Sequence, residues 1–214
     1  CIRDRLEGQG GSGKTYTAVN FFCTLYGCEN VCVVTPTHEI KESHKKDYCL
    51  KYPNLTIETY YKMLGLNAFK LEDYDPAATH RSIYRRRVII WDEIYRVGDI
   101  SKFREFVTVL LSLGCVVVMC GDYHQLPAIN CNKEGMKDFY DTVRTLPGCI
   151  VHKFEDDRRA YCPKLRELKL KMWGKSDKEQ AEELLKVVKS VDVNYLRENW
   201  RPTDLVLGTM HALS

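Results

Sequence analysis

The sequence predicts an α/β fold in which a parallel β-sheet is covered by helices on both faces. Short β-branched runs alternate with longer stretches of helical periodicity through the first half of the chain. Three of the short runs are continuously apolar and end in polar residues, as strands buried in a parallel sheet do. The 214 residues, 44% of them hydrophobic, suffice for one full domain and part of a second.

The expected elements follow in chain order. The strands are a weaker first one at Ile2–Leu6 and three clear ones at Val31–Thr35, Val88–Asp92 and Cys115–Gly121. The stretches with apolar residues at helical spacing are 14–26, 38–50 and 101–113. Ligands of an open α/β sheet bind outside the carboxyl ends of its strands. The polar residues that end these strands should therefore converge on one site.

The sequence changes character after Pro147-Gly148. The segment Lys164–Val191 is predicted to be largely helical, and Ser176 to Glu179 form a capping box that opens a helix. Asp204–Gly208 is predicted to begin a new strand. We therefore expect a first domain over residues 1–148 and, over 149–214, the helical segment and first strand of a second domain whose remainder lies outside this chain.

Charge and cysteine content restrict the class of protein. The formal net charge is only +3, so affinity for nucleic acid must come from local patches. The ten cysteines show no Cys-x-x-Cys pair and no zinc-type spacing, and we expect them to be reduced, mostly as core residues, in a reducing intracellular compartment. No run of about 18 apolar residues and no signal-peptide pattern occurs, so no membrane partner is expected.

A phosphate-binding pattern, G-x-x-x-x-G-K-[ST], lies between the first strand and the first helix. Its glycines let backbone N–H groups point at a phosphate, Lys14 can reach the β and γ phosphates of ATP, and the Thr15 hydroxyl can ligate Mg²⁺. The predicted nucleotide-binding residues are Gly8, Gly10, Gly11, Ser12, Gly13, Lys14 and Thr15. Chance would produce the pattern in roughly one chain per hundred of this length, which disfavours an incidental glycine-rich turn.

Two adjacent carboxylates follow the apolar strand that begins at Val88. Asp92 is predicted to hold the magnesium ion through water, and Glu93 to orient and deprotonate the attacking water. An isolated Asp-Glu pair is usually a solvated surface feature. This pair gains weight from the strand before it and from the phosphate-binding pattern earlier in the chain.

The run Gly121-Asp122-Tyr123-His124-Gln125-Leu126-Pro127 resembles motif III of superfamily 1 helicases, especially the RecD-like branch and its viral relatives. Further segments resemble the other motifs in the same order: residues 35–37 motif Ia, residues 59–66 motif Ib, Asp92-Glu93 motif II, Arg159 the motif IV arginine, and residues 204–209 the strand and loop after it. The resemblance covers residues 5 to about 130 well. It implies a RecA-like motor domain followed by a partial second one.

The resemblance also implies residue roles. Gln125 would contact the γ-phosphate, and Arg159, or alternatively Arg158, would reach it from the second domain. The residues implied to touch a single nucleic-acid strand are Pro36, Thr37, His38, Thr59 and Thr209. Tyr60 and Tyr61 follow the motif Ib threonine, and at least one of them, with Tyr60 favoured, is expected to stack on a base. The basic cluster Arg81, Arg85, Arg86 and Arg87 lies either near strand phosphates or on a solvated face.

The expected function is an ATP-dependent translocase or helicase acting on single-stranded nucleic acid, with DNA favoured over RNA and 5′-to-3′ polarity. A viral-type superfamily 1 RNA helicase is the first alternative, because Arg159 is closely followed by Cys162-Pro163. A P-loop kinase and a binding module without hydrolysis are alternatives from other classes. The sequence departs from the family at Ile94-Tyr95-Arg96 and at Ala128, neither of which carries a predicted catalytic charge.

Overall fold

The computed structural model of the chain describes residues 3–63, 86–97, 100–124, 133–146, 148–155, 163–172 and 175–186. The chain divides into two compact units, residues 1–166 and 167–214. The first unit contains the sheet and the carboxylate pair Asp92-Glu93.

The first unit is built on a six-stranded sheet in which every strand pair is parallel. The strands are β1 Arg3–Gly8, β2 Val31–Thr35, β3 Thr56–Thr59, β4 Val88–Trp91, β5 Val116–Gly121 and β6 Cys149–Phe154. Their spatial order is β3-β2-β4-β5-β1-β6. The predicted fold class is confirmed, and the arrangement is consistent with a RecA-like α/β domain.

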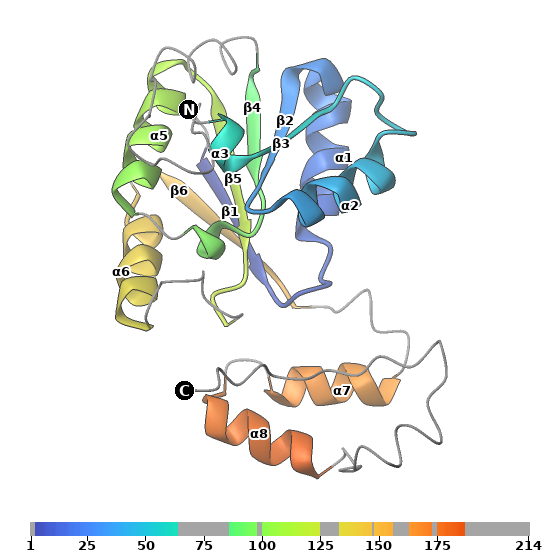
Figure 1. The fold of residues 1–214 in the computed structure, drawn as a ribbon, viewed down its shortest axis with the longest axis vertical. Helices are drawn as coiled ribbons and strands as arrows, with labels where there is room; N and C mark the ends of the chain where they lie inside the picture. Colours follow the sequence, from blue (N-terminus) through green and yellow to red (C-terminus); the bar gives the residue numbers. More distant parts are fainter. Residues whose placement is uncertain are drawn as a thin grey trace, which may run out of the picture. The chain divides into compact units, whose positions relative to one another are not determined.

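Helices cover both faces of this sheet (Figure 1). The elements on one face are α1 Lys14–Tyr26 and α2 His38–Tyr48, and those on the other are α5 Ile100–Ser112 and α6 Lys133–Arg144. Shorter elements are α3 Tyr60–Met63 and the 3-10 turns η1 Cys28–Asn30 and η2 Ile94–Arg96. Each face has its own hydrophobic core, so the sheet is buried between two layers.

Strand β4 illustrates why continuous apolar runs become central strands here. Successive side chains of a strand point to opposite faces. Ile89 and Trp91 therefore pack in the core beneath α5 and α6, whereas Val88 and Ile90 pack in the core beneath α1 and α2. All four residues are fully buried, which leaves no position in this strand for a polar side chain. The first polar residue, Asp92, appears where the strand ends.

Strand β6, like strand β3 and helix α6, was not anticipated by the sequence analysis. It pairs with β1 from Arg3 opposite Cys149 to Gly8 opposite Phe154. The sheet of the first unit therefore extends past residue 148, where we expected the domain boundary. Most of β6 is exposed, since Ile150, Val151 and their neighbours lie at the edge of the sheet, and the strand lacks the apolar pattern of the buried ones.

The C-terminal third contains α7 Pro163–Met172 and α8 Asp177–Leu185. The capping box predicted at the start of α8 is confirmed. The Ser176 backbone N–H donates to Glu179 Oε2 at 2.9 Å, and the Glu179 N–H donates to Ser176 Oγ at 3.4 Å. The strand predicted at 204–208 lies outside the described residues. Within the described ranges, no helix has the length and apolar character needed to cross a membrane.

Candidate nucleotide and nucleic-acid site

The loop between β1 and α1 has the backbone that its glycines predict. Gly11 and Gly13 have φ angles of 90° and 88°, a conformation that residues with side chains rarely adopt. Gly13 is the N-cap of α1, and no side chain caps the first turn of this helix. Backbone N–H groups at an uncapped helix N-terminus suit an anion. Gly8 is required for space, because a Cβ there would lie 2.2 Å from the Phe154 carbonyl oxygen in β6.

Lys14 is a buried cation inside this loop. Its Nζ donates to the carbonyl oxygens of Gly8 at 2.6 Å and Gln9 at 3.0 Å, and to Ser12 Oγ at 3.4 Å. Only 6% of the residue is exposed. All three acceptors are uncharged, and a buried ammonium group is better stabilised by an anion. The position therefore favours the binding of a phosphate beside Lys14.

Thr15 and Asp92 are brought together as the sequence predicted, although 77 residues separate them. The Thr15 hydroxyl donates to Asp92 Oδ1 in a short hydrogen bond. The Asp92 backbone N–H donates to the Val34 carbonyl oxygen at 2.8 Å, which continues the pairing of β4 with β2 beyond the strand end. Asp92 is therefore held by both its main chain and its side chain, with only 6% of the residue exposed.

Glu93 has an unusual backbone and an unusual acidity. Its φ of 50° and ψ of 49° are left-handed, and it is the only described residue other than glycine with a positive φ. Such conformations cost free energy and are concentrated at functional sites. Burial, with a further contribution from the Asp92 charge, raises the pKa of the Glu93 carboxyl to about 7. A carboxyl with this pKa can act as a general base near neutral pH.

His44 belongs to the site, and the sequence analysis missed it. It lies in the middle of α2, and its Nε2 is 2.6 Å from Asp92 Oδ2. The signal that could have revealed it is the spacing of Lys41, His44 and Tyr48, which form the buried side of α2. A lysine and a histidine on the inward face of a helix require polar partners. The partner of Lys41 is Glu58, at 2.8 Å, and that of His44 is Asp92.

The end of β5 reaches the same edge of the sheet. Asp122 is 5% exposed, and its Oδ1 accepts the His124 backbone N–H at 3.0 Å. This turn begins the segment that resembles motif III. Gln125, Arg158, Arg159 and Thr209 lie outside the described residues, so their predicted roles remain predictions.

The described residues predicted to contact nucleic acid lie at the carboxyl ends of β2 and β3. Thr37 caps α2, because its Oγ1 accepts the Ile40 N–H at 3.4 Å. Thr59 Oγ1 accepts the Lys62 N–H at 3.4 Å in the same way at α3. Pro36 is half-buried and His38 is exposed. Both threonines thus stabilise helix starts, and these helix starts lie next to each other because β2 and β3 pair.

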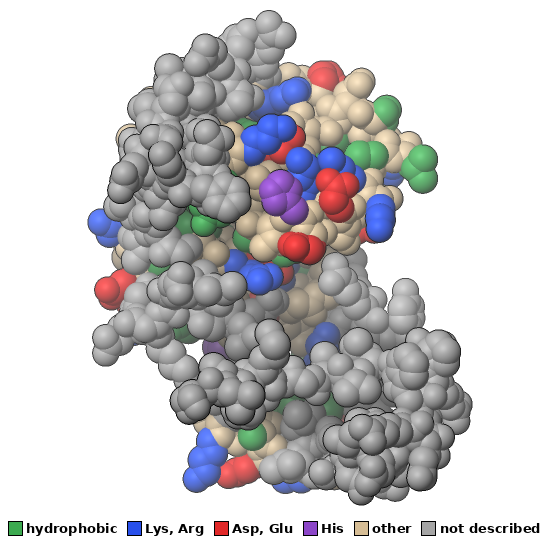
Figure 2. Space-filling view, in the orientation of Figure 1, with side chains coloured by type: hydrophobic (Ala, Val, Ile, Leu, Met, Phe, Trp, Pro, Cys, Tyr) green, Lys and Arg blue, Asp and Glu red, His purple; other side chains and the backbone are tan. Residues whose placement is uncertain are grey.

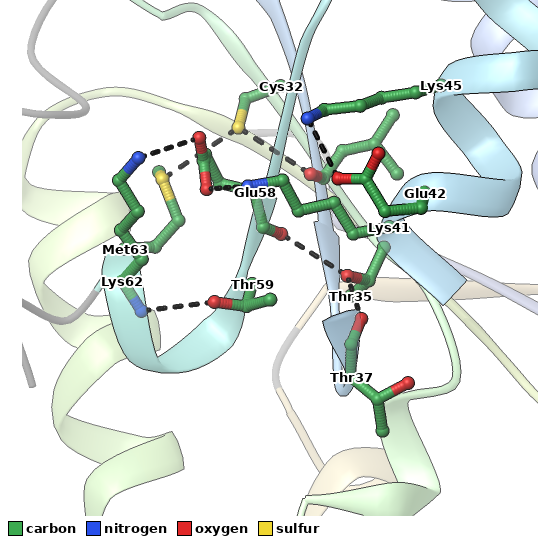
Figure 3. Close-up of polar contacts among 11 residues, drawn as sticks. Cys32, Thr35, Thr37, Lys41, Glu42, Lys45, Glu58, Thr59, Lys62 and Met63 are labelled. Carbon is green, nitrogen blue, oxygen red and sulfur yellow. Dashed lines mark hydrogen bonds and ion pairs between the residues drawn. The ribbon is translucent and has the colours of Figure 1, made fainter. Parts of the chain in front are cut away.

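Two lysines, Lys41 in α2 and Lys62 in α3, flank the Glu58 carboxylate of β3 (Figure 3). Glu58 Oε2 lies 2.8 Å from Lys41 Nζ, and Glu58 Oε1 lies 3.0 Å from Lys62 Nζ. These two lysines hold the pKa of the Glu58 carboxyl below its usual value, against the opposing effect of burial. The surface over α2 shows basic and acidic side chains side by side around a histidine (Figure 2).

Tyr60 requires a correction. It is only 5% exposed, and its ring packs against Trp91 at 5.1 Å and Phe106 at 6.1 Å between centroids. A ring held in the core cannot stack on a base. Tyr61, which is 42% exposed, takes its place as the candidate for stacking. The reason is geometric: α3 turns its first residue into the core and its second toward solvent.

Arg86 and Arg87, the described part of the basic cluster before β4, lie at the other end of the strands. Arg81 and Arg85 are outside the described residues. The Arg86 guanidinium donates to the Glu29 carbonyl oxygen, and the Arg87 N–H donates to the Asn30 carbonyl oxygen at 2.9 Å. These contacts precede the amino end of β4, whereas the phosphate-binding loop lies at the carboxyl edge of the sheet. Arg86 and Arg87 are therefore not near the candidate nucleotide site.

The oxygen atoms around Thr15 fit a magnesium ion that binds together with a nucleotide. Among the described residues, no three His, Cys, Asp or Glu side chains form a metal-binding group. Mg²⁺ usually takes only one or two protein ligands and completes its shell with water and phosphate oxygens. The Thr15 hydroxyl and the Asp92 carboxylate meet that requirement, whereas an all-protein metal site is not present in the described residues.

Comparison with known proteins found no protein-family model and no curated protein that matches the chain.

Proposed function

We propose that this chain binds and hydrolyses ATP with Mg²⁺ and couples hydrolysis to movement along single-stranded nucleic acid, as a helicase or translocase motor. The observation that carries the proposal is the meeting of Lys14, Thr15, Asp92 and Glu93 at the carboxyl edge of one parallel sheet. This edge is where α/β sheets bind ligands. The four residues supply the charge, the metal ligands and the base that hydrolysis of a phosphoanhydride needs.

Each residue has a defined task in the proposed reaction. Lys14 exchanges its carbonyl acceptors for phosphate oxygens, and the N–H groups of the loop donate to the same phosphates. Thr15 and Asp92 would hold the magnesium ion, which would supply positive charge to neutralise the phosphates. Glu93 accepts a proton from the attacking water while the water oxygen forms a bond to the γ-phosphorus. The bond between the γ-phosphorus and the oxygen shared with the β-phosphate breaks, and that oxygen leaves with the β-phosphate.

The proposed path of the nucleic-acid strand runs over the starts of α2 and α3. Thr37, His38 and Thr59 lie there, with Tyr61 exposed beside them. Lys41 and Lys62 supply positive charge close to this path, and each is paired with Glu58. Aromatic stacking and lysine contacts to phosphates together bind single strands without sequence preference.

The proposal includes a reducing compartment. It is supported by six described cysteines that are free thiols, namely Cys23, Cys28, Cys32, Cys49, Cys115 and Cys120. Burial raises the pKa of Cys32 to about 12, so this thiol is unreactive as well as inaccessible.

The test measures binding of Mg-ATP and release of phosphate with no nucleic acid, with single-stranded DNA and with single-stranded RNA. Lys14→Ala should abolish hydrolysis and weaken Mg-ATP binding, because it removes the charge that faces the phosphates. Glu93→Gln should keep binding and slow hydrolysis by about two to four orders of magnitude. Lys46→Ala, an exposed change on α2, is the control and should behave as wild type.

The outcomes separate the candidate functions. Stimulation by DNA above RNA supports the DNA motor, and the reverse supports the viral-type RNA helicase. Phosphate transfer to a small acceptor without stimulation by either nucleic acid would indicate a P-loop kinase. Normal turnover in Lys14→Ala would contradict the assignment of the phosphate-binding loop.

A further inference from the structure

His44 is fixed against the carboxylate that is predicted to serve the magnesium ion. Its side chain and that of Asp92 are each 9% exposed, and His44 Nε2 lies 2.6 Å from Asp92 Oδ2. The other oxygen, Asp92 Oδ1, accepts the Thr15 hydroxyl. The two carboxylate oxygens are therefore engaged on different sides, one by α2 and one by the first turn of α1.

This geometry limits the rotation of the Asp92 carboxylate. A carboxylate that accepts at only one oxygen can turn about its χ2 bond, because that torsion has a broad minimum. Donors at both oxygens, from two separate helices, hold the plane of the carboxylate in one orientation. Oδ1 then faces Thr15, which is the side on which a magnesium ion shared with this hydroxyl would lie.

The histidine side chain at position 44 lowers the stability of the folded chain in one respect. The other ring nitrogen, Nδ1, is buried without a hydrogen-bond partner in the part of the chain that the structure describes. An unsatisfied buried polar atom is destabilising. A leucine or methionine would fill the same space between α2 and the sheet without this cost, so packing alone does not explain a histidine here.

We propose that His44 is a positioning residue that orients the Asp92 carboxylate for a magnesium ion bound with the nucleotide. This inference rests on the proposed function, because it assigns His44 a role toward the metal of that site. His44 is not a ligand of the ion and does not touch the reacting atoms. It acts through Asp92, as residues that hydrogen-bond to metal-binding carboxylates do in other sites.

The experiment titrates Mg²⁺ against the full chain at a fixed concentration of fluorescent ATP analogue and measures bound nucleotide, with a parallel series in EDTA. His44→Phe fills the ring volume without a donor, and His44→Gln retains an N–H donor at a similar reach. His44→Phe should raise the half-saturating Mg²⁺ concentration about tenfold. It should leave metal-free nucleotide binding unchanged, and His44→Gln should restore most of the wild-type value. The Mn²⁺ affinity, measured by electron paramagnetic resonance, should be lowest in His44→Phe and close to wild type in His44→Gln.

Leu110→Ala is the control for loss of stability. It opens a cavity under α5 on the opposite face of the sheet, so it should lower the melting temperature without changing the Mg²⁺ dependence. Equal Mg²⁺ dependence in wild type and His44→Phe would overturn the positioning role while leaving the proposed function intact. An equal increase of the half-saturating Mg²⁺ concentration in His44→Phe, His44→Gln and Leu110→Ala would show that His44 acts only through packing. If wild type binds no nucleotide in either series, the proposed function fails and this inference fails with it.

Discussion

Replacing Glu93 by glutamine should change how stability depends on pH, whatever the protein's function. The folded-state pKa of about 7 lies above the ordinary value of 4.5. Below 4.5 the carboxyl is protonated in the folded and unfolded chains, and the contribution to stability is fully present. As the pH rises toward 7 the unfolded chain loses this proton while the folded chain keeps it, so the contribution is lost. Wild type should therefore lose stability relative to Glu93→Gln through this window.

The expected size follows from the difference between the two pKa values. At about 1.4 kcal/mol for each pH unit, a carboxyl shifted from 4.5 to about 7 loses about 3 kcal/mol of unfolding free energy across the window. The side chain is not fully buried, so this value is an upper limit. Above pH 7 the difference in unfolding free energy between Glu93→Gln and wild type should stay constant.

Urea unfolding of the metal-free, nucleotide-free protein at several pH values from 5 to 8.5 provides the measurement. The control is Glu39→Gln, because hydrogen bonds from the Glu39 N–H and the Thr37 side chain lower the pKa of the exposed Glu39 carboxyl. These hydrogen bonds stabilise the folded chain above the unfolded-state pKa of Glu39, and this stabilisation is lost as the pH falls. Glu39→Gln should therefore be less stable than wild type at neutral pH. A pH-independent difference between Glu93→Gln and wild type, or a difference of the opposite sign, would refute the assigned pKa.

Three further predictions concern the fold and the nucleic-acid face. Gly8→Ala should prevent the normal pairing of β1 with β6, because its Cβ would overlap the Phe154 carbonyl oxygen, and should lower the melting temperature measured by calorimetry. Tyr61→Ala should weaken binding of single-stranded nucleic acid by about 1–3 kcal/mol at unchanged stability, whereas Tyr60→Ala should cost about 3–5 kcal/mol of folding free energy. Lys62→Ala should reduce the slope of log affinity against log salt by about one, measured by fluorescence anisotropy.

The sequence predicted the buried strands and the phosphate-binding loop well, for a physical reason. Strands such as β2 and β4 are enclosed on both faces, so every position is buried, every position except Thr35 at the end of β2 is apolar, and the pattern is unambiguous. The loop at Gly11 and Gly13 requires positive φ angles, which only glycine adopts readily, so the local sequence specifies the local backbone.

Strand β6 and His44 could not be predicted because tertiary contacts decide them. β6 lies at a sheet edge with most residues exposed, so its own composition does not distinguish it from a loop. Its pairing with β1 depends on the register set by the rest of the sheet. His44 acquires its role only because α2 packs over the end of β4, and nothing in residues 38–48 alone identifies Asp92 as its partner.

The charges of the site explain why nucleotide binding and protein stability should be coupled. Lys14 is buried against uncharged oxygens, and Glu93 is buried beside Asp92 with a raised pKa. Lys14 partly offsets the charge on Glu93, but burial and Asp92 outweigh it and the pKa of Glu93 stays raised in the nucleotide-free protein. Phosphates would stabilise Lys14, and a cation at Thr15 and Asp92 would lower the pKa of Glu93 toward its ordinary range. The arrangement that is costly without a ligand would thus become favourable with the proposed one, and part of the binding free energy would be the relief of unfavourable electrostatics already present in the fold.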